Sequence, residues 1–188
     1  MSEKLYLDAQ TLLEESWQLG GMVADSGFRP TFILALWRGG APIGVALQEM
    51  LKARGISADH IAIRTQSYRG IDGRHDSVKV FSMNYVVKNV RHDDSLLIVD
   101  DVFDTGRSIE AVIAHLRLKA RENTPANIRV AVPYYKPSRN MTDREPDYYL
   151  HETNQWLKFP HSLEGLTDDE ILNKRPELAV ILAEADGL

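Results

Sequence analysis

The stretch that decides the fold is Leu96-Leu97-Ile98-Val99-Asp100-Asp101-Val102-Phe103-Asp104-Thr105-Gly106-Arg107-Ser108. An apolar run of strand length ends in two adjacent carboxylates, and a polar turn then leads into an expected helix. In open α/β sheets, ligands bind beyond the carboxyl ends of the strands. The free N–H groups at the start of a helix suit a phosphate, and two neighbouring carboxylates suit sugar hydroxyls or a magnesium ion.

Short strands and helices alternate on both sides of this stretch. We expect strands over residues 31–37, 60–65, 84–88, 95–99 and 128–134. We expect helices over residues 8–23, 41–54 and 108–121. Residues 67–82 are expected to form a long loop, since they contain Gly70 and Gly73 and few apolar side chains. This alternation indicates an α/β protein with a central, mainly parallel sheet flanked by helices.

The chain of 188 residues is expected to form a single domain. Its core spans about residues 25–135, and residues 136–166, which hold aromatics and prolines in an irregular pattern, form a small C-terminal hood. Residues 167–188 are expected to be helical. The sequence Thr167-Asp168-Asp169-Glu170 matches a capping box, and Pro176 can start a last helix that reaches Glu184.

The composition is that of a soluble globular protein, with 44% hydrophobic and 26% charged residues. The net charge of −5 argues against nucleic acid as a partner. There is no apolar stretch long enough to span a membrane and no leader-like N-terminus, so the expected location is the cytoplasm. The absence of cysteine excludes thiol catalysis and cysteine-ligated metal centres.

The stretch quoted first resembles the phosphoribosyl-diphosphate (PRPP) signature of type I phosphoribosyltransferases. Its Asp-Asp-x-x-Asp-Thr-Gly form is similar to that of the 6-oxopurine enzymes, which act on hypoxanthine, guanine or xanthine. The resemblance implies that Asp100 and Asp101 hold the ribose 2- and 3-hydroxyls. They would also hold a Mg2+ ion, directly or through those hydroxyls and water. The same resemblance places Asp104 near N7 of the purine as a proton acceptor. It implies that the 5-phosphate is bound by Asp104, Thr105, Gly106, Arg107 and Ser108.

Two further segments resemble the same family. Trp37-Arg38-Gly39-Gly40 is similar to its pyrophosphate loop, in which Arg38 offers a cation and the glycines expose N–H groups to the diphosphate. Relatives often carry a cis peptide bond here, and we predict one between Trp37 and Arg38. Ser67-Tyr68 resembles the Ser-Tyr pair of a mobile catalytic loop that closes over PRPP and shields the reacting centre from water. The alternative is a solvated basic loop, and the bases that can meet the diphosphate are Arg69, Arg74 and Lys79.

Residues after the last expected core strand resemble base-binding residues. Lys136 stands where the 6-oxopurine enzymes carry a lysine that donates to O6, and its ammonium opposes the exocyclic amine of adenine. Residues 147–150 and 155–160 resemble the hood of the smaller bacterial and archaeal enzymes. In that hood Trp156 would stack on the purine, and the main chain of Leu157 would face N1 or C2. The alternative for Trp156 is an ordinary core or edge aromatic.

Together these resemblances imply a purine-salvage enzyme that transfers 5-phosphoribosyl from PRPP to N9 of a 6-oxopurine. Arg38 and Asp104 would be its catalytic residues, Mg2+ its cofactor, and a homodimer or tetramer its assembly. Two alternatives stay open: a PRPP-sensing regulator of the same fold, and a phosphoribosyltransferase for another base. A P-loop enzyme is disfavoured, because the pattern Gly-x-x-x-x-Gly-Lys-Ser/Thr does not occur.

Overall fold

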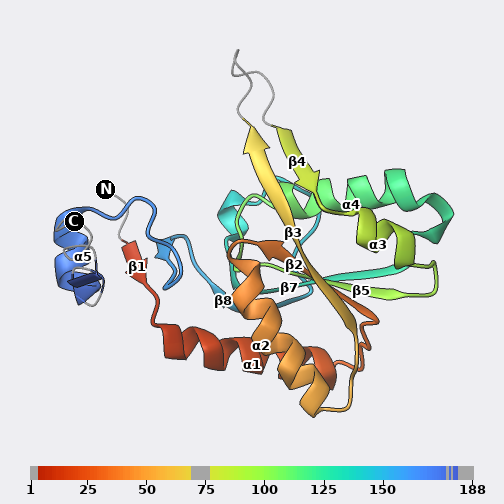
Figure 1. Ribbon diagram of the computed structural model, residues 1–188, viewed down its shortest axis with the longest axis horizontal. Coiled ribbons are helices and arrows are strands. Elements are labelled where there is room, and N and C mark those ends of the chain that lie inside the picture. The colour runs from red at the N-terminus through yellow and green to blue at the C-terminus, as the bar shows by residue number, and fades with distance from the viewer. Residues whose placement is uncertain (1–3, 69–76, 177, 179, 182–188) are drawn as a thin grey trace. The chain divides into compact units, whose positions relative to one another are not determined.

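The computed structural model describes residues 4–68, 77–176, 178 and 180–181 (Figure 1). The chain forms two compact units. The larger comprises Gln10–Asn154, and the smaller combines Met1–Ala9 with Gln155–Leu188. Residues 136–154 of the expected hood therefore belong to the larger unit, and residues 155–166 to the smaller one.

A seven-stranded sheet forms the centre of the larger unit, in the order β4-β3-β2-β5-β7-β6 with β8 paired to β7. The strands are β2 (Phe32–Trp37), β3 (Asp59–Tyr68), β4 (Ser77–Phe81), β5 (Ser95–Val99), β6 (Val102–Phe103), β7 (Asn127–Tyr135) and β8 (Tyr148–Glu152). Only β4 runs antiparallel to its neighbour among these described strands. The mainly parallel sheet is confirmed, and the carboxyl ends of β2, β5 and β7 meet at one edge.

Helices cover both faces of this sheet, α1 and α2 on one side and α3 and α4 on the other (Figure 1). They are α1 (Ala9–Asp25), α2 (Gly40–Ala53), α3 (Asn84–Asn89) and α4 (Arg107–Ala120). Leu34 of β2 and Ile98 of β5 are fully buried in one cluster with Val112 and Leu116 of α4. Strands that are buried on both faces read as continuous apolar runs, which explains the sequences of β2 and β5. None of the described helices is long and apolar enough to cross a bilayer.

The sequence predictions for residues 67–88 are partly wrong. Residues expected as a strand, 84–88, lie in helix α3. The expected loop over 67–82 is shortened at both ends, because β3 continues to Tyr68 and β4 pairs with it, Gln66 opposite Lys79. Val78 and Val80 are half-buried and Lys79 and Phe81 are exposed, which is the two-residue period of an edge strand. Residues 69–76 lie outside the described part of the chain.

The smaller unit contains β1 (Lys4–Tyr6) and β9 (Trp156–Lys158), which pair in parallel, and helix α5 (Asp168–Lys174). The predicted capping box is confirmed. The Thr167 hydroxyl accepts from Glu170 N at 3.3 Å, and Glu170 Oε2 accepts from Thr167 N at 2.9 Å. Of the expected last helix, residues 176, 178 and 180–181 are helical, and the rest lies outside the described residues.

Candidate functional site

Two loops meet at the carboxyl edge of the sheet, one after β2 and one after β5. The Trp37–Arg38 peptide bond is cis, as predicted. A Cβ atom on Gly39 would stand 1.8 Å from Asp101 Oδ2, and one on Gly40 would stand 2.5 Å from the backbone oxygen of Val99. Because a side chain at position 40 would meet the backbone of Val99 and Asp100, Gly40 lets the loop after Arg38 lie against the two acids, with Gly39 next to Asp101.

The adjacent acids Asp100 and Asp101 are both partly buried. Asp100 Oδ1 accepts a hydrogen bond from Asp101 N at 2.9 Å. Burial raises the pKa of Asp100 well above its usual 3.8, and the neighbouring Asp101 carboxylate raises that pKa further. A cation or hydroxyl donors placed between these carboxylates would therefore relieve an existing electrostatic cost.

The donor set of this acid pair fits Mg2+. Magnesium is usually bound through one or two carboxylates and keeps water and substrate phosphates as its other ligands. Within the described part of the chain, no three acidic, histidine or cysteine side chains are grouped to hold a metal ion. Asp100 and Asp101 would therefore share such an ion with substrate oxygens and water.

The loop between β6 and α4 is shaped for an anion. Gly106 has a φ of +75°, and a Cβ there would stand 2.6 Å from Thr142 Oγ1 and 2.8 Å from the Phe103 ring. Helix α4 then begins at Arg107, so the positive end of its dipole and its first-turn N–H groups lie at this loop. Met141 N donates to the Thr105 carbonyl at 3.1 Å and supports the loop from outside. We call residues 104–108 the phosphate loop, after the role that the resemblance implies for them.

Lys136 and Asp104 lie side by side. Lys136 N donates to the Phe103 carbonyl at 2.9 Å, which ties the residue after β7 to the end of β6, next to the phosphate loop. The Lys136 side chain is only 7% exposed, and its Nζ lies 3.6 Å from Asp104 Oδ2. The other oxygen, Asp104 Oδ1, accepts from Arg139 Nε at 2.5 Å.

Arg139 is a site residue that the sequence analysis missed. It lies in the 3-10 turn Pro137–Arg139, and its N–H donates to the Lys136 carbonyl at 3.0 Å. In a 3-10 turn, side chains three residues apart point the same way. The spacing of Lys136 and Arg139 around Pro137 was therefore the available signal.

The other predicted site residues lie on β3 and β9. Ser67 pairs with Val78 near the end of β3, and Tyr68 ends that strand. Arg69 and Arg74 lie outside the described residues. In the smaller unit, Trp156 is 52% exposed, and Leu157 of β9 pairs with Leu5 of β1. The roles expected for these residues stay predictions.

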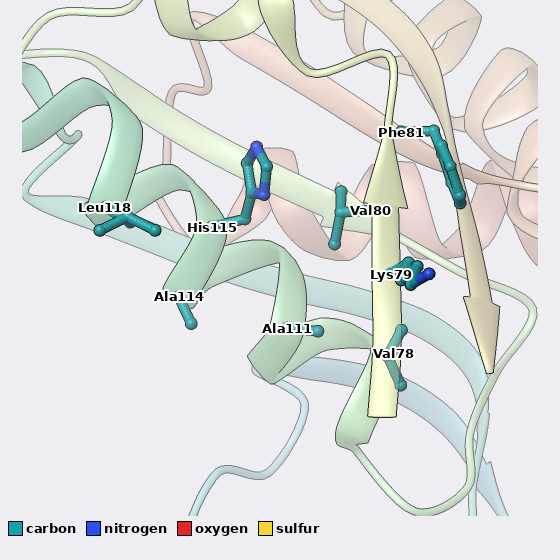
Figure 2. Close-up of a pocket in the computed structure, with 8 residues that line it drawn as sticks. All are labelled: Val78, Lys79, Val80, Phe81, Ala111, Ala114, His115 and Leu118. Carbon is teal, nitrogen blue, oxygen red and sulfur yellow. The ribbon is translucent and has the colours of Figure 1, made fainter. Parts of the chain in front are cut away.

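A groove of about 490 Å³ lies between β4 and α4 (Figure 2). It is lined by Val78, Lys79, Val80, Phe81, Ala111, Ala114, His115 and Leu118. Its lining is mostly apolar, and of the bases considered for the diphosphate it contains Lys79. Asp100, Asp101, the phosphate loop and Lys136 are not among the residues that line this groove.

Solved structures share this fold. A purine phosphoribosyltransferase from Pyrococcus horikoshii Ot3 is 24% identical, with a TM-score of 0.69 over 88% of this chain and 97% of its own. A hypothetical protein from Neisseria gonorrhoeae with bound ppGpp is 18% identical, with a TM-score of 0.72 over 96% of this chain and 98% of its own. The Helicobacter pylori xanthine-guanine-hypoxanthine phosphoribosyltransferase is 17% identical, with a TM-score of 0.60 over 85% and 92%.

The search of curated proteins gave no match. The sequence model of the phosphoribosyl transferase domain matches residues 18–170, which include the loops after β2, β5, β6 and β7. This match covers well over half of the chain and agrees with the resemblance seen in the PRPP signature. The chain therefore belongs to the phosphoribosyl transferase domain family.

Proposed function

We propose that this protein is a purine-salvage phosphoribosyltransferase for a 6-oxopurine: hypoxanthine, guanine or xanthine. It transfers 5-phosphoribosyl from PRPP to N9 of the base and releases diphosphate and the nucleoside 5-monophosphate. The observation that carries the proposal is the Lys136 ammonium 3.6 Å from Asp104 Oδ2, next to the phosphate loop. Family membership supports the transfer reaction, and this pair of side chains supports the choice of base.

The pair of Lys136 and Asp104 suits one edge of a 6-oxopurine. That edge carries O6, an acceptor, beside N7, as in guanine. Lys136 is a donor only, and the Asp104 carboxylate is an acceptor only. They therefore match O6 and a protonated N7 together. Adenine places an N6 amine where O6 would be, and that amine offers Lys136 no acceptor.

The remaining contacts hold PRPP. Asp100 and Asp101 accept from the ribose hydroxyls, and the phosphate loop binds the 5-phosphate through backbone N–H groups and the hydroxyls of Thr105 and Ser108. Arg38 and the N–H groups of Gly39 and Gly40 stabilise the diphosphate as it leaves. Fixed donors aimed at developing charge are the usual main source of such catalysis.

In the reaction, N9 of the base attacks the anomeric carbon as the bond from that carbon to diphosphate breaks. Asp104 accepts the proton at N7, which keeps the base nucleophilic. Mg2+, when bound, neutralises charge on the diphosphate and so assists its departure. Ser67 and Tyr68, at the end of β3, shield bound PRPP from water.

Asp104→Asn tests this assignment, because it keeps the shape of the side chain but removes the proton acceptor. We expect kcat with an oxopurine to fall roughly 100-fold, within the range for general-base catalysis, while KM for PRPP changes little. Asp93→Asn is the matched control, since Asp93 is exposed in the turn before β5. Full turnover by Asp104→Asn would contradict the role proposed for Asp104.

A ligand-sensing regulator is the second candidate, and the Neisseria gonorrhoeae structure with bound ppGpp favours it. A regulator of this kind would bind PRPP or ppGpp but would convert no base. Calorimetric titration with each ligand, run beside the turnover assay, separates the two functions. Binding without turnover of any purine or pyrimidine base favours the regulator, and turnover favours the enzyme.

A further inference from the structure

We propose that Arg139 is a positioning residue that keeps Asp104 and Lys136 separate as an acceptor and a donor for the base. The proposal rests on the proposed function. Arg139 Nε donates to Asp104 Oδ1 at 2.5 Å, whereas Lys136 Nζ stands 3.6 Å from Oδ2. The carboxylate therefore has one oxygen bound by Arg139 and one that faces the neighbouring ammonium.

The two distances show that Arg139 is hydrogen-bonded to Asp104 and that Lys136 is not. A charge-assisted N–H···O bond is usually 2.7–2.9 Å long, so Arg139 is fully engaged with Asp104. At 3.6 Å, Lys136 is too far from Oδ2 for a hydrogen bond. Lys136 is buried, and a free carboxylate beside it would draw its ammonium into a tight pair. By binding Oδ1, Arg139 weakens that attraction and leaves the Lys136 donor available for O6.

The backbone around Arg139 fixes this arrangement. Lys136 N donates to the Phe103 carbonyl at the end of β6, and Met141 N donates to the Thr105 carbonyl of the phosphate loop, so the segment is held on both sides of Arg139. The Arg139 side chain is half exposed, with 51% of it accessible. Removing it takes nothing from the core, so the effect of a variant can be assigned to the charge and the hydrogen bond.

The experiment compares kinetics of the wild type and Arg139→Ala with hypoxanthine, guanine and xanthine. We expect kcat/KM for the preferred oxopurine to fall about 10- to 100-fold, as for a lost hydrogen bond to a charged group. KM for PRPP and the thermal midpoint should stay close to the wild-type values. Arg54→Ala is the matched control, because Arg54 is also an exposed arginine paired with an aspartate, Asp25.

Chemical rescue separates positioning from a general structural role. Guanidinium ion at tens of millimolar should restore part of the activity of Arg139→Ala, because it can occupy the vacated place beside Asp104 Oδ1. Sodium chloride at the same ionic strength should not. Arg139→Lys should recover less than full activity, since an ammonium is a point charge without the planar fork of arginine.

Each outcome decides the proposal. Wild-type kinetics in Arg139→Ala, or a loss confined to KM for PRPP, would overturn it, as would a loss that sodium chloride restores equally well. In all three cases the wild type still turns over, so the proposed function stands. A wild-type protein that converts no oxopurine overturns the proposed function and the positioning role together.

Discussion

Asp100 is a carboxyl group whose pKa is raised by burial and by the adjacent Asp101. An acid with a raised pKa in the folded state lowers stability when the pH exceeds its usual value, because the unfolded chain gives up the proton at a lower pH than the folded protein does. Asp100→Asn should therefore raise the thermal midpoint at pH 7–8. About 2–4 °C is expected for each kcal/mol gained.

The gain in stability expected for Asp100→Asn depends on pH. The stability difference between Asp100→Asn and the wild type should shrink as the pH falls toward 3.8, the usual value for this group. Differential scanning calorimetry across this range measures the change. The same variant should bind PRPP more weakly, since a ribose ligand is lost. A variant less stable than the wild type at pH 8 would contradict the account of the acid pair.

Lys136 is the residue that we assign to base selection. Lys136→Met keeps the buried aliphatic chain and removes the ammonium. We expect kcat/KM for hypoxanthine and guanine to fall roughly 10- to 100-fold, because the partner of O6 is lost. KM for PRPP should change little. Equal losses for oxopurines and adenine in a steady-state assay would argue against this role.

The residues of the site differ in how far sequence could locate them. Asp100, Asp101 and the phosphate loop are contiguous, so a local pattern of strand, turn and helix was enough to place them. Gly39 and Gly40 were predicted to expose N–H groups, but the approach of Gly39 to Asp101 and of Gly40 to Val99 needs two strands to be adjacent. The bond from Arg139 to Asp104 joins residues 35 positions apart, so the spacing of Lys136 and Arg139 could single out Arg139 but could not identify Asp104 as its partner.

At the scale of elements, the phosphate loop depends on Gly106. Gly106→Ala imposes a positive φ on alanine and also places a methyl group 2.6 Å from Thr142 Oγ1. We expect a loss of stability of more than about 1 kcal/mol and a higher KM for PRPP. Urea unfolding and steady-state kinetics measure the two effects.

Gly27 provides the control for this change. It has a φ of +80°, but nothing lies within 4 Å of the position of an added Cβ. Gly27→Ala should therefore cost about 1 kcal/mol through the backbone alone and leave the kinetics unchanged. If Gly106→Ala lowered the free energy of unfolding no more than Gly27→Ala and left KM for PRPP unchanged, the close packing around Gly106 would not contribute to PRPP binding.

Elements buried in the sheet were predicted better than elements at its edge. The continuous apolar runs of β2 and β5 are typical of strands that are covered by helices on both faces. The sequence was therefore enough to predict where these two strands lie. The α3 segment, Asn84–Asn89, contains Val86 and Val87, and such short apolar runs do not separate strand from helix. β4 becomes a strand through its pairing with β3, and its five residues carry little signal of their own.

At the scale of the whole molecule, Glu170 joins β1 to the start of α5 within the smaller unit. Its Oε1 accepts from Lys4 Nζ at 2.5 Å and from Tyr6 Oη at 2.6 Å, while Oε2 caps α5. The hydrogen bond from Lys4, followed by those from Tyr6 and Thr167, lowers the pKa of Glu170 to about 2. The stabilisation is present above the usual value of 4.5 and is lost as the pH falls toward 2.

Glu170→Gln should loosen β1 and α5 and leave the sheet of the larger unit intact. Hydrogen exchange followed by mass spectrometry is the measurement. At pH 7 we expect faster exchange in residues 4–7 and 168–174 only. Unchanged exchange in both segments would show that these hydrogen bonds do not hold the unit together.

The oligomeric state was predicted from the resemblance to the family, and no residue of the chain was used to predict it. The predicted homodimer or tetramer stays a prediction, and light scattering after gel filtration measures it. The α/β class, by contrast, followed from the alternation of strands and helices. The division at Asn154 was not foreseen, because residues 1–9 join the smaller unit through a β1–β9 pairing between distant parts of the chain.

The most direct test of the account is turnover by the wild-type protein. The protein is incubated with Mg2+, PRPP and one base at a time: hypoxanthine, guanine, xanthine or adenine. Nucleoside monophosphate and diphosphate are then quantified by chromatography. We predict conversion of at least one oxopurine and much slower conversion of adenine. Conversion of adenine alone, or of no base by a protein that still binds PRPP, would contradict the proposed function.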